Sequence, residues 1–301
     1  MTSTYASPVR LPHLGLGCSS FWANPLFPET DAHALVVDAI RLGVSYLDTG
    51  ASYQDGEAER RLGRILAKID RSPITLSTKA GTRVSPSRKL YKDFSPAWIE
   101  QSLHGSLDRL QLDSCDILFL HGPQVSDLSP ELIARLETLK AQGKCRAVGV
   151  NSFDPAVLEA VLSLPFDGVM LQYNVLDQRA DELMHHFREQ RKFVIAGTAL
   201  AQGLYSLRTV NPLRPSGLWY LLRALKNNPR NLLAIRRLAF MHELDGVTAG
   251  QAALRFVLDH PAVNCALFGT TSAKHLEENA RAADIRMPAS VRERLRSAAQ
   301  A

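Results

Sequence analysis

The sequence predicts an α/β protein of the (β/α)8 barrel, or TIM barrel, class, and three observations indicate it. Eight short apolar runs rich in Val, Ile and Leu are flanked by turn residues, as fully buried parallel strands should be. Segments with apolar residues at helical spacing lie between them, so strand and helix alternate about eight times. A chain of 301 residues has the length of one such barrel. A doubly wound open sheet is the alternative, but no GxGxxG turn follows the first run, where Gly15 and Gly17 stand alone.

Each predicted strand is a run of five or six residues, mostly apolar and bounded by turn signals. In chain order the eight runs are Leu14–Cys18, Val44–Asp48, Ile74–Lys79, Asp116–His121, Arg146–Val150, Gly168–Gln172, Phe193–Gly197 and Cys265–Gly269. No linker or low-complexity tract divides the chain, so residues 1–301 are predicted to form a single domain.

Most of the predicted helices begin at a residue that caps a helix N-terminus, several of them followed by proline at the first helical position. They are Asp31–Leu42 after Thr30, a helix from Ser95–Pro96 to about Leu110, one from Ser129–Pro130 to about Gln142, one after Asp154–Pro155, and then Glu182–Arg191 and Ala249–Leu258. Each lies between two predicted strands, as a parallel barrel requires.

One segment interrupts the regular spacing of strands and helices. Gly203–Gly246 separates the seventh strand from the helix before the eighth, and it contains Pro212, Pro215 and the aromatic pair Trp219–Tyr220. We interpret it as a long loop with helical pieces over the barrel mouth. Long loops in compact domains are usually functional.

Composition and charge narrow the class of protein. Apolar types make up 46% of the residues, which excludes disorder, and no apolar run approaches the roughly 18 residues that span a bilayer. Met1–Pro12 lacks the pattern of a signal peptide, and four cysteines without a CxxC pair predict buried thiols in a reducing cytoplasm. The net charge of +5 comes from basic residues interleaved with acidic ones, so no nucleic-acid partner is expected. Arg83–Lys92 is a basic cluster in a predicted loop that would attract an anionic ligand.

Ionisable side chains follow three neighbouring predicted strands. The second strand ends in Asp48, with Tyr53 just beyond it, the third ends in Lys79 and the fourth ends in His121. In a barrel the active site lies at these C-terminal strand ends. A half-buried charge there must be paired or have a shifted pKa. Taken singly, each residue has a structural explanation: a turn cap, a packed loop tyrosine, a surface lysine and a core histidine.

The four side chains form a chemically coherent set. A tyrosine with a pKa near 10 is a poor acid at neutral pH, but a nearby ammonium lowers that pKa by favouring the phenolate. An aspartate that pairs with the lysine keeps it charged and in position. A histidine beside the phenol can donate a hydrogen bond to a carbonyl oxygen. Together they would polarise a carbonyl and protonate the alkoxide formed as a hydride arrives.

These residues lie in motifs that resemble those of the aldo-keto reductase family. The segment Asp48–Glu59, followed by Leu62–Gly63, looks like the signature around the family's catalytic Asp and Tyr. Thr78-Lys79 and Leu120-His121 fall where the family carries its Lys and His. The resemblance extends from Leu14 to Asn279. It implies that Asp48, Tyr53, Lys79 and His121 are the catalytic residues.

The resemblance also implies a nicotinamide dinucleotide across the barrel mouth. No metal site is expected, because the four cysteines are far apart in the sequence and form no CxxC pair. Asn151, Ser152 and Gln172 match the residues that hold the carboxamide, and a helix that starts near Ser272 would point its amides at a phosphate. The full set implied for the cofactor is Gly17, Cys18, Asp48, Asn151, Ser152, Gln172, Thr198, Leu200, Ala201, Gly203, Gly269, Thr270, Thr271, Ser272, His275, Glu278 and Asn279.

The sequence departs from the family pattern at two places. Gly197 stands where an aromatic residue commonly stacks on the nicotinamide. In the last motif, residues such as Thr271 and His275 stand where a cation usually binds the 2′-phosphate of NADP, and Lys274 is nearby. NADP is favoured by the resemblance, and NAD is the alternative because that cation is absent.

Three functions are consistent with these residues. The first is an NAD(P)-dependent reductase or dehydrogenase acting on an aldehyde, ketone or sugar carbonyl, with Tyr53 as the general acid. The second is a cofactor-sensing or partner-binding subunit, which the resemblance to potassium-channel β-subunits would allow. The third is a Schiff-base lyase with Lys79 as the nucleophile, although Asp48 would keep that amine protonated.

The substrate pocket is predicted from the loops after the strands. Ser19 and Trp22 after the first strand and Trp219 in the long loop are expected to form walls. The partner is expected to be a small molecule, and the oligomeric state is left open.

Overall fold

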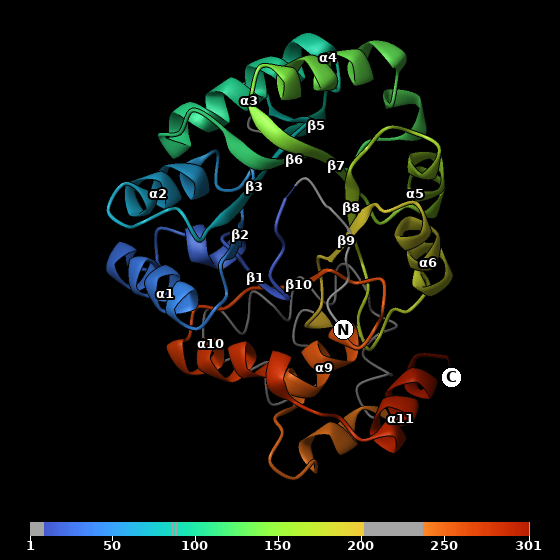
Figure 1. Cartoon of the computed structure of the whole chain (residues 1–301). Helices are drawn as coiled ribbons and strands as arrows, with labels where there is room; N and C mark the ends of the chain where they lie inside the picture. Colours follow the sequence, from blue (N-terminus) through green and yellow to red (C-terminus); the bar gives the residue numbers. More distant parts are fainter. Residues whose placement is uncertain (1–8, 86, 88, 202–236, 301) are drawn as a thin grey trace.

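The computed structural model describes residues 9–85, 87, 89–201 and 237–300. Eight parallel strands close into a barrel in the order β1-β10-β9-β8-β7-β6-β3-β2, with the helices outside it (Figure 1). The strands are β1 (Leu14–Gly17), β2 (Tyr46–Asp48), β3 (Thr75–Ala80), β6 (Cys115–His121), β7 (Cys145–Asn151), β8 (Gly168–Leu171), β9 (Phe193–Ala196) and β10 (Cys265–Phe268). The prediction of a (β/α)8 barrel with these eight strands is confirmed, with ends that differ by one or two residues, and the open sheet is excluded by the pairing of β1 with β10.

Helices of the described residues alternate with the strands as predicted. They are α1 (Glu29–Arg41), α2 (Glu57–Leu66), α3 (Pro96–Leu110), α4 (Pro130–Ala141), α5 (Pro155–Leu162), α6 (Asp181–Glu189), α9 (Ala249–Leu258), α10 (Ala273–Ala280) and α11 (Ala289–Gln300). Short 3-10 helices lie at Ser20–Ala23, Val125–Asp127, Ala239–His242 and Arg281–Asp284. No helix in this part of the chain is both long enough and apolar enough to cross a bilayer.

Three of the four predicted N-caps are confirmed. Ser95, Ser129 and Asp154 each accept a hydrogen bond from a backbone N–H two or three residues further on, and each precedes a proline in the first turn. The fourth prediction is wrong. Helix α1 begins at Glu29 after Pro28, so Thr30 lies inside the first turn, where its hydroxyl donates to Asp31.

The core has two layers that follow the alternation of side chains along each strand. On β6, Ile117 and Phe119 point into the barrel with Met170 and Phe193, whereas Leu118 and Leu120 pack against the surrounding helices. The strands are therefore buried on both faces. This burial explains why they occur in the sequence as continuous apolar runs.

The basic cluster Arg83–Lys92 does not form a simple loop. It contains an antiparallel hairpin of β4 (Thr82–Val84) and β5 (Leu90–Lys92), in which Thr82 pairs with Lys92. The predicted loop is corrected here, because backbone pairing directly after β3 orders both ends of the segment. The hairpin stands at the C-terminal edge of the barrel, next to the end of β6.

Two other expectations concern particular segments. All four cysteines, Cys18, Cys115, Cys145 and Cys265, are buried free thiols, as predicted. Most of the long segment predicted at Gly203–Gly246, including Trp219, lies outside the described residues, and so does the cofactor candidate Gly203.

Candidate active site

The barrel register brings Asp48 and Lys79 together at the ends of β2 and β3. The Lys79 ammonium lies 2.6 Å from Oδ1 and 2.5 Å from Oδ2 of Asp48, and it also donates to the carbonyl oxygen of Thr49 at 2.9 Å. Both side chains are buried. Ser77 on β3 donates a further hydrogen bond of 2.7 Å to Asp48 Oδ1, and the hydroxyl of Tyr46 lies 2.7 Å from Ser77 Oγ.

Lys79 keeps its charge in this buried position. Burial by itself would lower the pKa of Lys79, but the negative charge of Asp48, followed by contributions from Tyr53, raises that pKa above its usual value. The ammonium lies 5.1 Å from the centroid of the Tyr53 ring. The positive charge of Lys79 thus lies close to the phenol of Tyr53, where it favours the phenolate form.

His121 also contacts Tyr53. The centroids of the two rings are 5.8 Å apart and their planes are nearly perpendicular. Burial, followed by the positive charges of Lys79 and Lys92, lowers the pKa of His121 to about 3. The imidazole is therefore neutral at physiological pH, and a neutral ring donates from one nitrogen and accepts at the other. Its Nδ1 lies 3.5 Å from the hydroxyl of Thr82.

Tyr53 and His121 line a cavity of about 280 Å³ at this edge of the barrel. The other lining residues of the described part are Ser52, Thr82, Leu90, Tyr91 and Lys92. Residues of the hairpin therefore form much of the cavity wall. The sequence did not predict a wall at these residues. The signal available in the sequence was the basic cluster itself.

Two of the predicted pocket walls, Ser19 and Trp22, belong to the described residues, and the third, Trp219, does not. Ser19 and Trp22 are absent from the lining of this cavity among the described residues. The ring of Trp22 is only 2% exposed and packs in the core, with the Arg61 guanidinium 5.7 Å from the ring centroid. Its predicted role as a pocket wall therefore stays a prediction.

Residues predicted to hold the carboxamide lie side by side at the ends of β7 and β8. Asn151 donates to the carbonyl oxygen of Met170 at 3.1 Å, Ser152 Oγ accepts from the backbone N–H of Asp154 at 3.2 Å, and Gln172 donates to Asp177 at 2.8 Å. Two amides and one hydroxyl provide both donors and acceptors. This set fits a carboxamide, which itself has one acceptor and two donors.

The predicted phosphate and adenosine side lies at the end of β10. Among the described residues, a Cβ on Gly269 would meet the Gly17 carbonyl oxygen alone, at 3.8 Å, so this part of the backbone leaves room for a bound group. Helix α10 begins after Ser272, whose hydroxyl accepts from the N–H of His275 at 3.4 Å. A helix start near Ser272 is thereby confirmed, and its N-terminal amides suit a phosphate.

Several other cofactor candidates are occupied by contacts within the protein. The hydroxyl of Thr198 accepts from Asn174 at 3.2 Å, the backbone oxygen of Glu278 accepts from Gln251 at 2.9 Å, and Asn279 is buried. Their predicted cofactor contacts stay predictions, as do those of Leu200, Ala201, Thr270 and Thr271.

Cys18, another cofactor candidate, is occupied by contacts within the protein. Its thiol is fully buried, lies 3.9 Å from the carbonyl oxygen of Leu16, and has a pKa raised by burial. Its predicted cofactor contact stays a prediction. The backbone N–H is also engaged, because it donates to the carbonyl oxygen of Asp48 at 2.7 Å.

The structure gives a physical reason for the glycine at position 197. A Cβ placed there would come within 3.0 Å of Met170 Cγ and 3.4 Å of its sulfur. Met170 is buried inside the barrel with Phe193 and Ile195. An aromatic side chain at Gly197 would need the space that Met170 occupies.

The candidate cation for a 2′-phosphate is exposed. The side chain of Lys274 is 82% exposed, and its ammonium lies 3.8 Å from Glu278 Oε1. A solvent-exposed ion pair of this kind contributes little binding energy.

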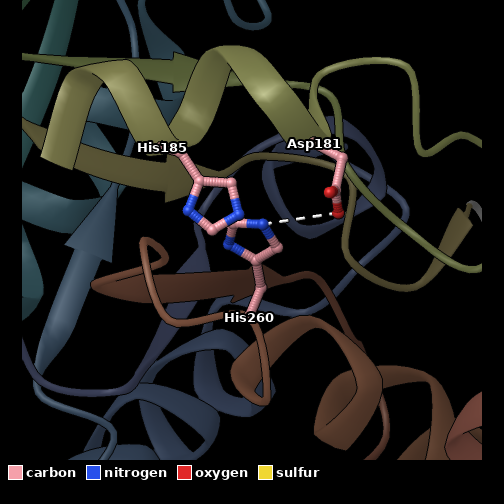
Figure 2. Close-up of side chains that lie close together, drawn as sticks. All are labelled: Asp181, His185 and His260. Atoms are coloured by element: carbon pink, nitrogen blue, oxygen red, sulfur yellow. Dashed lines mark ion pairs between the residues drawn. The ribbon is translucent and has the colours of Figure 1, made fainter.

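Three ionisable residues outside this cavity lie close enough together to be considered as a metal site, although no metal is expected. Atoms of Asp181, His185 and His260 that could act as ligands lie within 4.8 Å of one another (Figure 2). His260 is 3% exposed, its Nδ1 accepts from the N–H of Ala262, and its Nε2 lies 3.4 Å from Asp181 Oδ1. With Nδ1 as acceptor, the proton of the neutral ring is on Nε2, which lies near the carboxylate but makes no hydrogen bond within the described residues. Metal-binding histidines show the opposite pattern, since their second nitrogen donates.

Comparison with known proteins identifies the family. A sequence model of the Aldo/keto reductase family matches residues 13–300. The chain is 30% identical over 287 residues to the uncharacterized oxidoreductase YqkF of Bacillus subtilis, covering 93% of this chain and 90% of that protein. It is 28% identical over 292 residues to L-galactose dehydrogenase of Arabidopsis thaliana, covering 89% and 85%.

Solved structures agree with this assignment. The chain superposes on the holo form of aldo-keto reductase AKR11C1 from Bacillus halodurans with a TM-score of 0.82 and 27% identity, covering 98% of this chain and 94% of that one. With Asp48, Lys79, Tyr53 and His121 gathered at one edge of the barrel, the chain belongs to the aldo/keto reductase family and is an NAD(P)-dependent oxidoreductase that acts on carbonyl or alcohol groups.

Proposed function

We propose that this protein reduces the carbonyl of an aldehyde, a ketone or an open-chain sugar to the alcohol, or catalyses the reverse reaction, with Tyr53 as the general acid or base. One observation carries the proposal. The Tyr53 phenol and the neutral His121 ring line one cavity, and the buried Lys79–Asp48 pair stands beside the phenol. These positions match the roles that carbonyl reduction requires.

Each residue has a separate task in the reduction. His121 donates a hydrogen bond to the carbonyl oxygen and orients it, which a neutral imidazole can do. Tyr53 donates its proton to that oxygen as negative charge develops there. The Lys79 ammonium stabilises the phenolate that remains, and Asp48 holds the ammonium in place. A bound nicotinamide dinucleotide would supply the hydride.

Asn151, Ser152 and Gln172 would hold the carboxamide of the cofactor, and the open backbone at Gly269 with the start of α10 would receive its phosphates. We propose NADP as the preferred cofactor because the family resemblance favours it. NAD is the second candidate, because Lys274 is the nearby cation in the last motif and is exposed and paired.

The Lys79 environment argues against a Schiff-base lyase. An amine nucleophile must lose its proton, whereas the Asp48 carboxylate and the Thr49 carbonyl oxygen accept hydrogen bonds from the Lys79 ammonium and favour its charged form. We further propose a single domain over residues 1–301, a cytoplasmic location and a small-molecule partner, with no nucleic acid and no metal.

A binding titration tests the proposal first. NADPH and NADH are titrated separately, with the fluorescence of the reduced nicotinamide as readout, and turnover is then measured on a panel of aldehydes, ketones and sugars. Binding with turnover supports the reductase. Tight binding without turnover on the panel would instead favour a cofactor-sensing subunit, and binding of neither cofactor would refute both.

A further inference from the structure

Lys92 is the cavity-lining residue whose charge the proposed chemistry does not use. It ends β5, and it lines the cavity together with Tyr53 and His121. Among the lining residues in the described part of the chain it is the one lysine or arginine, and the low pKa of His121 keeps that ring neutral.

The ammonium of Lys92 is held in place by neutral acceptors. It donates to the hydroxyl of Thr82 at 2.9 Å and to the backbone oxygen of His121 at 2.5 Å. The same Thr82 hydroxyl lies 3.5 Å from His121 Nδ1. Thr82 therefore places the Lys92 charge next to the ring that orients the carbonyl.

The protein supplies no close counter-charge for this ammonium. Within residues 9–85, 87, 89–201 and 237–300, no carboxylate lies within 4.0 Å of Lys92 Nζ, although Arg83 in the same hairpin pairs with Asp93. The rest of the sequence has no Asp or Glu side chain to offer: residues 1–8, 86, 88, 202–236 and 301 contain none. All 30 acidic side chains are thus in the described part. Burial lowers the pKa of Lys92, and Asp127 only partly opposes that effect.

We infer that Lys92 binds an anionic group of the substrate, so that the preferred substrates are small carbonyl compounds carrying a carboxylate or a phosphate. This inference rests on the proposed function and specifies its substrate class. The carbonyl end lies at Tyr53 and His121, and the anionic end pairs with Lys92 in the same cavity. A volume of about 280 Å³ is at the small end of the usual range for ligand sites, so the two groups are separated by only a few bonds.

The experiment compares matched pairs of substrates. Succinic semialdehyde is paired with butanal, and glyceraldehyde 3-phosphate with glyceraldehyde, so each pair differs mainly in its charge. The readout is the ratio of kcat/KM for the anionic and the neutral member. A charge-assisted hydrogen bond predicts a ratio of about 10 to 100 in the wild type, once the intrinsic reactivity of each aldehyde is corrected for. The pair with the larger ratio shows whether carboxylate or phosphate is bound.

Three variants test whether the charge of Lys92, or only its structural contacts, determines the ratio of kcat/KM values. Lys92→Met is expected to lower the ratio to near 1, and Lys92→Arg is expected to retain most of it. Lys89→Met is the matched control, because Lys89 belongs to the same hairpin segment but does not line the cavity. It should leave the ratio unchanged. If Lys92 only braces His121, Lys92→Met would lower kcat/KM for both members alike and the inference would fail.

A binding measurement keeps the test independent of turnover. Glycerol 3-phosphate and 4-hydroxybutyrate, the alcohol products, are titrated calorimetrically into the wild type and Lys92→Met. Binding that is lost in the variant supports the inference even if no carbonyl is reduced, in which case the proposed function fails. Turnover with equal kcat/KM values for the neutral and the anionic substrate of each pair overturns the inference and leaves the proposed function standing. The inference is also overturned if neither product binds the wild type, or if the wild type and Lys92→Met bind the products equally well.

Discussion

The Tyr53 ring packs against the His121 ring and also lies close to the Lys79 ammonium. The two rings meet edge to face, with centroids 5.8 Å apart. The Lys79 ammonium is 5.1 Å from the Tyr53 centroid. The phenol thus adjoins a neutral hydrogen-bonding ring and a fixed positive charge, which is the arrangement expected of a proton donor to a carbonyl oxygen.

Tyr53→Phe is expected to reduce kcat by about 100- to 10,000-fold, the usual contribution of a general acid. The variant removes the proton donor and almost no volume, so the affinity for reduced cofactor should stay within about twofold. Steady-state kinetics and the fluorescence titration measure the two effects. Tyr173→Phe is the control, because the hydroxyl of Tyr173 bonds to Asp181 and does not line the cavity. Equal activity of Tyr53→Phe and wild type would refute the assigned role.

Asp48→Asn is expected to destabilise the protein by about 3–5 kcal/mol, because it leaves the buried Lys79 charge without its partner. Chemical denaturation measures the change in the free energy of unfolding. The double variant Asp48→Asn/Lys79→Met should recover much of this loss, since it removes the unpaired charge as well. A double variant less stable than Asp48→Asn would show that the ion pair is not the source of the effect.

The stability of the protein is expected to fall in mildly acidic solution because of His260. Burial, followed by smaller effects that include His185, lowers the pKa of His260 from 6.5 to about 4. The unfolded chain therefore binds a proton at a higher pH than the folded chain does. The stabilisation is fully present above pH 6.5 and is lost as the pH falls toward 4, with an upper limit of about 3 kcal/mol. Denaturation curves between pH 4 and pH 7.5 measure it, and His260→Asn should show a shallower dependence on pH. An identical slope would contradict the prediction.

A new cation at position 271 is expected to change the choice of cofactor. Thr271 is half-buried in the last motif, close to the start of α10. Thr271→Arg should tighten NADPH relative to NADH by about tenfold if it faces the 2′-phosphate, because an Arg–phosphate contact is charge-assisted. Thr271→Gln has a long polar side chain without charge and serves as the control. An unchanged NADPH/NADH ratio in Thr271→Arg would place the 2′-phosphate elsewhere.

The strands, most of the helices and the catalytic candidates could be predicted from the sequence because local patterns determine them. A strand buried on both faces must be continuously apolar, and Ser or Asp before Pro is favourable at a helix start wherever it occurs. An ionisable residue at the end of an apolar run can be recognised in the sequence because the residues before it are mostly apolar. Asp48, Lys79 and His121 were therefore visible as strand ends without knowledge of their distances.

Only the tertiary structure determines which side chains from distant segments pack together or line the same cavity. Closure of the barrel and pairing of the β4–β5 hairpin bring Lys92 against the end of β6, and no local pattern records that contact. The same is true of Trp22, which packing turns into the core, and of Gly197, whose neighbour Met170 comes from another strand. Sequence spacing determines local conformation, whereas contacts between distant segments depend on how the strands and helices pack, and the walls of the cavity follow from that packing.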